Sequence, residues 1–211
     1  ARSAAALEEA AAAFRAEGWS AAALPLDITD TGTVAAAIEA AEPFDILLNN
    51  AGLARHSVFT ETEPTDYDAA MAINVRAAYF IAQAVAKRLI AAGRPGAIVN
   101  LSSQMGHVGG PKRAVYCATK HAMEGMTKAM ALDLGPHGIR VNTVGPTFIE
   151  TELTKGSLAD PDFRDWVMSK IALGRLGTVE DVMGPVVFLA SDAARLITGT
   201  SLLVDGGWTA A

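Results

Sequence analysis

The chain has 211 residues, of which 51% are hydrophobic and 6% aromatic, and it carries a formal net charge of −6. This acidic balance argues against a nucleic-acid partner, because binding to phosphates normally needs a basic face, and apolar runs such as residues 186–190 are too short to span a bilayer. The single cysteine, Cys117, permits no internal disulfide and fits a reducing compartment, so we expect a cytoplasmic protein; the four histidines lack the spacing of a metal site.

Strands and helices are predicted to alternate along the whole chain. Periodic apolar segments with capping residues predict helices over residues 3–18, 30–42, 65–93, 114–135, 162–171 and 178–190. Short apolar runs predict strands over residues 22–26, 44–52, 96–103, 138–146 and 201–207, and residues 147–162 read as an irregular segment. This order predicts an α/β fold of three layers, with a parallel sheet between helices and ligands bound beyond the carboxyl ends of the strands. No linker composition divides residues 1–211, so we expect one domain.

One stretch combines three polar side chains at informative spacings. Tyr116 and Lys120 lie four residues apart on a predicted helix, so they share a face. An ammonium near a phenol favours the phenolate and lowers the pKa of the tyrosine, which suits proton transfer near neutral pH. Ser103 ends the preceding strand and could hold a substrate oxygen beside the phenol. Proton transfer at an alcohol or carbonyl oxygen is typically coupled to hydride transfer with a nicotinamide.

The sequence resembles the short-chain dehydrogenase/reductase family over essentially its whole length. The resemblance rests on six motifs: NNAG (49–52), NV (74–75), SS (102–103), YCATK (116–120), IRVNTVGP (139–146) and GTSLLVDGG (199–207). It implies a Rossmann-like doubly wound sheet and a nicotinamide cofactor.

The resemblance also implies roles for individual residues. Asn74, Ser103, Tyr116 and Lys120 match the family's catalytic tetrad, in which Tyr116 would be the acid and base, Lys120 would tune it, and Asn74 would hold a water. Ser103, Gln104 and Tyr116 are expected to bind substrate, although Gln104 could instead be a loop residue facing water. The residues expected at the cofactor are Arg2, Asp27, Ile28, Asn49, Ala51, Gly52, Tyr116, Lys120, Pro146, Ile149 and Thr151.

The family's first strand, glycine-rich turn, helix and second strand have no counterpart in this sequence. In the family these strands lie between the ones predicted here at residues 22–26 and 44–52. Their removal would leave a gap of about 14 Å, or three strand spacings of about 4.8 Å, with two unpaired edges. We therefore expect the chain to be an N-terminally truncated domain whose phosphate-binding turn is supplied from elsewhere. The alternative is a real truncation, with the two flanking strands paired directly and little cofactor binding, as in a non-enzymatic homologue.

Cofactor and substrate choice are the least determined features of the sequence. Family members that use NADP tend to carry a basic residue where Arg2 stands, so we favour NADP(H), with NAD(H) possible. The site motifs are closest in style to ketose, polyol and dicarbonyl reductases, with 3-oxoacyl-[acyl-carrier-protein] reductases as the alternative. Glu150 and Glu152 would disfavour anionic substrates if they pointed inward. A regulatory NAD(P)-sensing protein is a further alternative, against which the intact tetrad argues. The resemblance also implies that the long helices over residues 65–93 and 114–135 form a dimer interface and that the last strand forms another, so we expect a homotetramer or homodimer.

Overall fold

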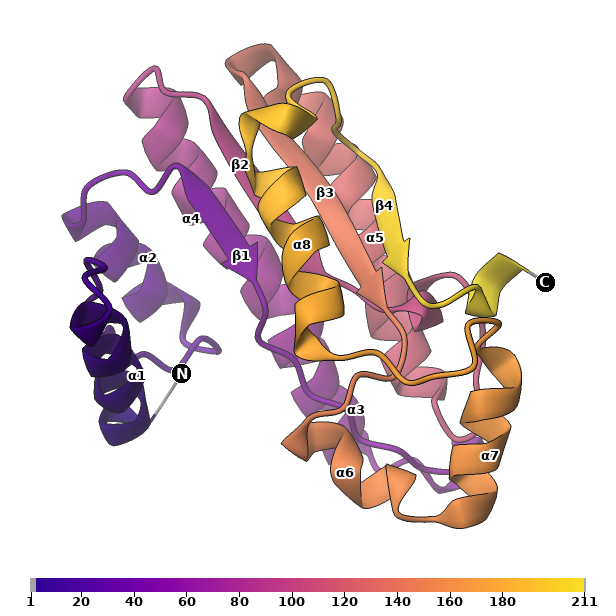
Figure 1. Cartoon of the computed structure of the whole chain (residues 1–211). Coiled ribbons are helices and arrows are strands. Elements are labelled where there is room, and N and C mark those ends of the chain that lie inside the picture. Colours follow the sequence, from indigo (N-terminus) through magenta and orange to yellow (C-terminus); the bar gives the residue numbers. More distant parts are fainter. Residues whose placement is uncertain (1–2, 211) are drawn as a thin grey trace.

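The computed structural model describes residues 3–210, without the side chains of residues 152 and 153. Four strands form one parallel sheet in the order β1 (Ile46–Asn49), β2 (Gly96–Leu101), β3 (Ile139–Pro146) and β4 (Ser201–Val204) (Figure 1). Their register aligns Asn49, Asn100 and Thr143 across three neighbouring strands. The shared direction brings all four carboxyl ends to the same edge of the sheet.

Eight α-helices connect or flank these strands. They are α1 (Ala4–Ala16), α2 (Thr31–Ala40), α3 (Pro64–Met71), α4 (Ala78–Ala91), α5 (Ala114–Leu134), α6 (Glu152–Leu158), α7 (Pro161–Lys170) and α8 (Val179–Ala190). Short 3-10 turns lie at Phe59–Glu61, Gln104–Gly106, Gly135–His137, Asp192–Ala194 and Trp208–Ala210, and a π-helical turn spans Ala72–Ala77. A capping box begins α8, because the side chains of Thr178 and Asp181 each bond the other's backbone.

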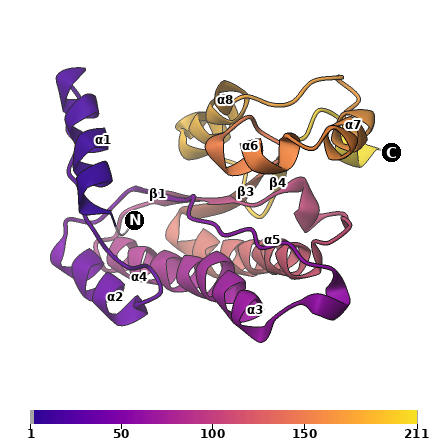
Figure 2. The same cartoon turned by 90° about the horizontal axis from the view of Figure 1, so that it is seen from below.

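The helices cover both faces of the sheet, which confirms the predicted three-layer architecture. Helices α2, α4 and α5 lie on one face, whereas α1, α6, α7 and α8 lie on the other (Figure 2). Ile98 and Val141 belong to the core beneath α4 and α5, whereas Val99 and Val144 pack with Leu189 of α8. Because successive residues of each strand point to opposite faces, both faces are apolar and the sheet is buried between two helical layers.

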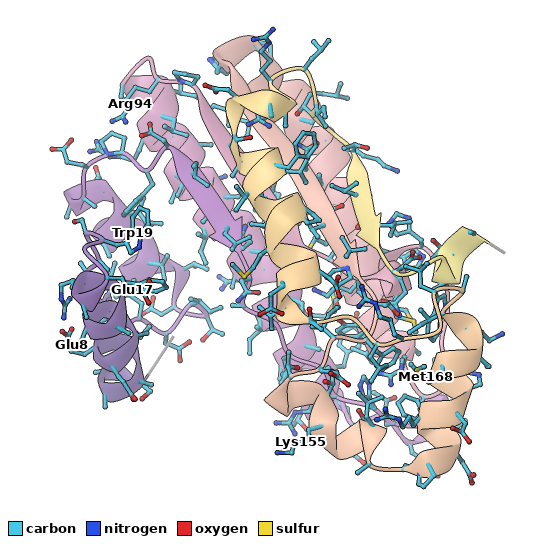
Figure 3. The ribbon with its side chains drawn as sticks, in the orientation of Figure 1. Glu8, Glu17, Trp19, Arg94, Lys155 and Met168 are labelled. Carbon is cyan, nitrogen blue, oxygen red and sulfur yellow. The ribbon has the colours of Figure 1, made fainter. Side chains whose placement is uncertain are left out.

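A third apolar cluster lies beyond the carboxyl ends of the strands. Helices α6 and α7 enclose it with the C-terminal turn, and its members include Phe148, Val167 and Trp208. Figure 3 places Met168 on α7 and Lys155 on α6, on the opposite side of the molecule from Trp19 beside α1. Part of the segment predicted to be irregular is therefore helical, since α6 begins inside residues 147–162. Its Thr151 cap and the apolar side chains beneath it supply the stabilisation that its sequence alone does not reveal.

Two other predicted elements differ from the structure. Residues 22–26 form no strand, because none of the described strands lies beside them to complete a hydrogen-bonded ladder. The helix predicted over residues 65–93 is interrupted by the π-helical turn Ala72–Ala77.

The segment Pro64–Ala91 is long and apolar enough to cross a membrane by length and composition alone. Its residues Ala82, Val85 and Leu89 are nevertheless buried in the core against the sheet, as in the core helix of a globular domain.

The outer edge of β1 is open among the described residues. Strand β1 pairs only with β2, and its Ile46 and Leu48 are 53% and 43% exposed. The two flanking segments, residues 22–26 and β1, are not paired with each other. An apolar, unpaired strand edge is unfavourable in water, so this edge is where a further element would stabilise the sheet most.

Candidate functional site

Two of the four predicted catalytic side chains, Ser103 and Tyr116, line a cavity beyond the carboxyl ends of β2 and β3. The cavity has a volume of about 190 Å³ and includes Ser103, Gln104 and Tyr116 in its wall. Its other lining residues are Ala54, His56, Met105, Arg113, Thr147, Phe148, Thr154 and Ser157. They come from the loop after β1, the first turn of α5, and the segment that follows β3. The expected position of the site, at the carboxyl edge of a parallel sheet, is therefore the position of this cavity.

Tyr116 and Lys120 stand one turn apart on α5; Lys120 is 4% exposed, and Tyr116 is half-buried. The Lys120 Nζ lies 5.6 Å from the centroid of the Tyr116 ring and donates a 2.7 Å hydrogen bond to the carbonyl of Leu101. Burial lowers the pKa of Lys120 to about 8, while the nearby carboxylate of Glu124 raises it. The ammonium therefore remains the main form at neutral pH, next to the phenol that it was expected to tune.

The pKa of Tyr116 differs in direction from the expectation. Burial raises it above its ordinary value, and the hydroxyl of Ser103 and the guanidinium of Arg113 act to lower it. The protein's own residues thus hold Tyr116 in the protonated form near neutral pH, as a proton donor. Sequence spacing could not give this sign, because the desolvation of the phenol depends on the aromatic and apolar side chains folded over it.

Ser103 and Gln104 form a buried polar pair at the end of β2. The Ser103 hydroxyl donates to the side-chain oxygen of Gln104 at 2.7 Å and accepts from the amide N–H of Met105 at 3.1 Å. Gln104 is only 2% exposed, so the alternative in which it faces water does not hold. Both side chains therefore present polar atoms to the cavity from fixed positions.

Asn74 lies in the π-helical turn and is fully buried. Its side-chain oxygen accepts from the Leu53 N–H at 2.7 Å, and its amide donates to the Leu53 carbonyl and to Thr119. A π-helical turn re-aims one side chain out of the regular helical face, and such turns are frequent at functional sites. Here the turn directs Asn74 against the loop after β1 and the first half of α5, which ties two parts of the site together.

The residues expected at the adenosine half of the cofactor do not converge in the same way. The side chain of Asn49 points into the interior, where it donates to the Ala78 carbonyl and to Asn100, so it ties β1 to the core. Asp27 is exposed and accepts from the backbone and hydroxyl of Thr29, Ile28 beside it is half-buried, and Arg2 lies outside the described residues. Ala51 and Gly52 are exposed on the loop after β1.

The segment after β3 borders the cavity on its other side. Pro146 ends β3 and its carbonyl accepts from the Ser103 hydroxyl at 3.4 Å, while Ile149 bridges to Gly177 and Thr151 caps α6. The buried hydroxyl of Thr147 has no hydrogen-bond partner. Because an unpaired buried hydroxyl is costly, this one suits a polar group of a bound molecule, such as the amide of a nicotinamide.

Sequence reasoning missed two further residues of the cavity wall, His56 and Arg113. The Arg113 Nη1 donates to His56 Nε2 at 2.5 Å, and the His56 ring meets the Tyr116 ring edge-on at 6.0 Å. Burial and, second to it, the positive charge of Arg113 lower the pKa of His56 to about 4, so the imidazole is neutral at neutral pH. The position of Arg113, three residues before Tyr116 on the same helical face, was the signal available in the sequence. Among the described residues, no group of three or more His, Cys, Asp or Glu side chains could hold a metal ion.

The fold and the arrangement of these side chains are those of the short-chain dehydrogenases/reductases. A family model described as enoyl-(acyl carrier protein) reductase matches residues 1–209. The chain belongs to this family of oxidoreductases, as the sequence motifs indicated.

Named relatives extend this assignment. The gluconate 5-dehydrogenase of Gluconobacter oxydans is 41% identical to this chain over 212 residues, which cover 99% of this chain and 82% of that protein. The human L-xylulose reductase is 40% identical over 185 residues, covering 88% of this chain and 76% of that protein. A gluconate 5-dehydrogenase from Burkholderia cenocepacia, crystallised with NADP and tartrate, superposes with a TM-score of 0.96 at 37% identity, over 100% of this chain and 84% of that one.

Proposed function

We propose that the protein interconverts a secondary alcohol and a ketone on a small polyol or ketose, with NADP(H) as the hydride carrier and Tyr116 as acid and base. The observation that carries the proposal is that Ser103 and Tyr116 line one cavity of about 190 Å³, with the buried Lys120 ammonium 5.6 Å from the centroid of the Tyr116 ring. That volume suits a small carbohydrate better than a long acyl chain, which favours this reading over a 3-oxoacyl-[acyl-carrier-protein] reductase. The relatives named as sugar dehydrogenases and reductases support the same substrate class.

The chain's own groups would divide the proton chemistry among them. The bound nicotinamide would supply or accept the hydride at the carbinol carbon. In the direction of reduction, the Tyr116 hydroxyl gives its proton to the carbonyl oxygen, and the Ser103 hydroxyl holds that oxygen by a hydrogen bond. The Lys120 ammonium stabilises the phenolate that remains on Tyr116. In the direction of oxidation the phenolate takes the proton back, so one residue serves both directions.

For the cofactor we favour NADP(H) over NAD(H). The support is the NADP bound in similar structures; the unpaired Thr147 hydroxyl beside the cavity suits the nicotinamide of either cofactor. Lys120, Pro146, Ile149 and Thr151 would meet the nicotinamide half of the molecule. Asn49 would act indirectly, by holding β1 and the loop after it in place. The ratio of kcat/KM with NADPH to that with NADH tests the choice, and a strong preference for NADH would reject it.

The test of the reaction is Tyr116→Phe, with Tyr67→Phe as the matched control, at a tyrosine of α3 that is 46% exposed. Oxidation of NADPH is followed with a panel of ketoses, dicarbonyls and 3-oxoacyl thioesters. Loss of general acid catalysis should lower turnover by about 1,000-fold while NADPH binding stays within about twofold, because the phenyl ring keeps its packing. Unchanged turnover in Tyr116→Phe would remove the proposed acid and base.

We further propose that additional strands, including a glycine-rich phosphate-binding turn, pair with the outer edge of β1 in the functional protein. The exposed apolar side chains of Ile46 and Leu48 support this. An intact-mass measurement of the purified protein tests it. A surplus of about 4 kDa over the 21.9 kDa of this chain would agree with the proposal, and equality of the two masses would contradict it.

We also propose a cytoplasmic homotetramer or homodimer. Its interface would include the apolar surface between α4 and α5, where Tyr79 and Ile90 are exposed. Size-exclusion chromatography with light scattering measures the state, and a monomer would reject it.

A further inference from the structure

Arg113 is a buried cation in the wall of the substrate cavity that has no carboxylate partner in the described part of the chain. The residue is 7% exposed, and its Nε makes no hydrogen bond. No ion pair within 4.0 Å joins Arg113 to an acidic side chain there. A buried charge of this kind is costly, and proteins normally pair it. The position of this unpaired guanidinium in a cavity wall indicates that a bound molecule supplies the missing negative charge.

The guanidinium is held by aromatic rings and by close backbone packing. It lies 5.3 Å from the centroid of Phe148 and 5.4 Å from that of Phe163. A Cβ at Gly110 would come within 3.0 Å of the end of the Met105 side chain and 3.1 Å of the Arg113 Cδ, so the loop packs closely against this arginine. The neighbouring Lys112 adopts a left-handed backbone, with φ of 60°, which costs free energy outside glycine. The loop before α5 is therefore shaped to seat this arginine.

The other groups of the cavity leave the positive charge uncompensated. His56 accepts a hydrogen bond from Arg113 through Nε2, so the ring is neutral and fixes the guanidinium without cancelling its charge. The remaining lining residues are neutral, and no carboxylate is among them. The side chain of Glu150 is exposed and lies outside the cavity. It therefore does not point inward, which was the condition under which it would disfavour anionic substrates. The side chain of Glu152 lies outside the described residues.

We propose that Arg113 binds a carboxylate group of the substrate, so that the preferred substrates are polyhydroxy acids and their keto forms rather than neutral ketoses. This inference rests on the proposed function and names its substrate class. Arg113 and Tyr116 lie one turn apart on α5 and face the same cavity, which sets the carboxylate at one end and the reacting carbon at the other. Planar guanidinium groups bind carboxylates through paired hydrogen bonds, which fixes orientation as well as affinity.

Tryptophan fluorescence gives a binding readout that does not depend on turnover. Trp166 stacks on Phe163 and Trp208 lies against Phe148, so both indoles adjoin the two rings that hold Arg113. The whole protein, with NADP⁺ present, is titrated separately with D-gluconate, neutral D-sorbitol of the same carbon number, and inorganic phosphate. We expect D-gluconate to bind at least tenfold more tightly than either of the others. Equal binding of sorbitol, or tighter binding of phosphate, would overturn the proposal without any substitution.

Three variants then test whether the tighter binding of D-gluconate comes from Arg113. Arg113→Gln should weaken D-gluconate binding by about 100-fold, because a charged hydrogen-bonding partner is lost, and should leave sorbitol binding within about threefold. Arg113→Lys keeps the positive charge but loses the paired N–H donors of the guanidinium, so its affinity for D-gluconate should lie between those of the unsubstituted protein and Arg113→Gln. Lys128→Gln removes an exposed cation of α5 that does not line the cavity, and this variant should bind both ligands as the unsubstituted protein does. Thermal melts exclude variants that fail to fold, and the comparison of Arg113→Lys with the unsubstituted protein still applies if the Gln variant is lost.

Oxidation of the same ligands separates this inference from the proposed function. Selective binding of D-gluconate without NADP⁺ reduction would leave the carboxylate site standing and remove the proposed reaction with this acid. Turnover of sorbitol at the same kcat/KM as D-gluconate, unaffected by Arg113→Gln, would leave the reaction standing and overturn the carboxylate site.

Discussion

Two cavities lie at opposite ends of the same parallel strands, and the larger one has the weaker claim to function. The cavity at the amino ends of β2 and β3 has a volume of about 500 Å³, against about 190 Å³ for the one at the carboxyl ends. In the larger cavity, Arg140 donates to the carbonyls of Leu189 and Ser191. In the smaller one, Arg113 and the Thr147 hydroxyl leave polar atoms unpaired. Unpaired polar atoms in a cavity wall are a better sign of a binding site than volume is, because a bound molecule can supply the missing hydrogen-bond partners.

The largest effect should come from Lys120→Met at the carboxyl end, with Lys128→Met on the exposed side of α5 as control. We expect ketone reduction to fall about 1,000-fold, because the phenolate of Tyr116 loses its cation. The melting temperature should not fall in parallel, since an apolar isostere removes a buried charge. In the unsubstituted protein, reduction should decline as pH rises through about 8, where Lys120 loses its proton. A parallel loss of stability and activity would mean that Lys120 acts mainly in packing.

Trp208→Ala tests the apolar support of the same cavity. Trp208 packs on Phe148 and against Trp166, at 8% exposure. Truncating it should cost about 3 kcal/mol of unfolding free energy, by lost burial and the cavity left behind. It should also raise KM, because Phe148 helps to hold Arg113. Chemical denaturation measures the first effect, and Trp19→Ala, at a 67% exposed tryptophan, should cost almost nothing.

At the amino end, Arg140→Met should lower stability without lowering activity, which is the opposite of the result expected for Lys120→Met. It leaves two backbone carbonyls without donors and should cost about 2 kcal/mol of unfolding free energy, with kcat and KM unchanged. The control is Arg195→Met, at an exposed arginine of the same cavity. A selective loss of turnover in Arg140→Met would give the larger cavity a functional role and break the contrast between the two ends.

The smallest expected effect is the part of the pH dependence of stability that comes from His56. Its folded pKa of about 4 lies below the ordinary 6.5, so the unfolded chain takes up the proton first as pH falls. The contribution of neutral His56 to stability is therefore complete above pH 6.5 and is lost as pH falls towards 4. His56→Gln should flatten this part of the stability profile, and His137→Gln, at an exposed histidine, should not. Denaturant midpoints across this range give the comparison.

The sequence predicted the elements whose signals are local. The apolar runs that became β2 and β3, and the Thr178–Asp181 capping box, carry their information within a few residues. Residues 22–26 have the composition of a strand, but a strand also needs a neighbour, and none of the described strands supplies one. Residues 147–162 lack a strong helical period, and α6 within them depends on the apolar cluster that it covers.

The same division holds for the site. The spacing of Ser103, Tyr116 and Lys120 by itself predicted the kind of chemistry that we propose for them, because residues four apart on a helix share a face and the end of a parallel strand faces the ligand. Only the tertiary structure decided the direction of the Tyr116 pKa, the burial of Arg113 between two phenyl rings, and the interior position of Asn49. Desolvation and charge pairing depend on side chains that meet from distant parts of the chain, and no local pattern records them.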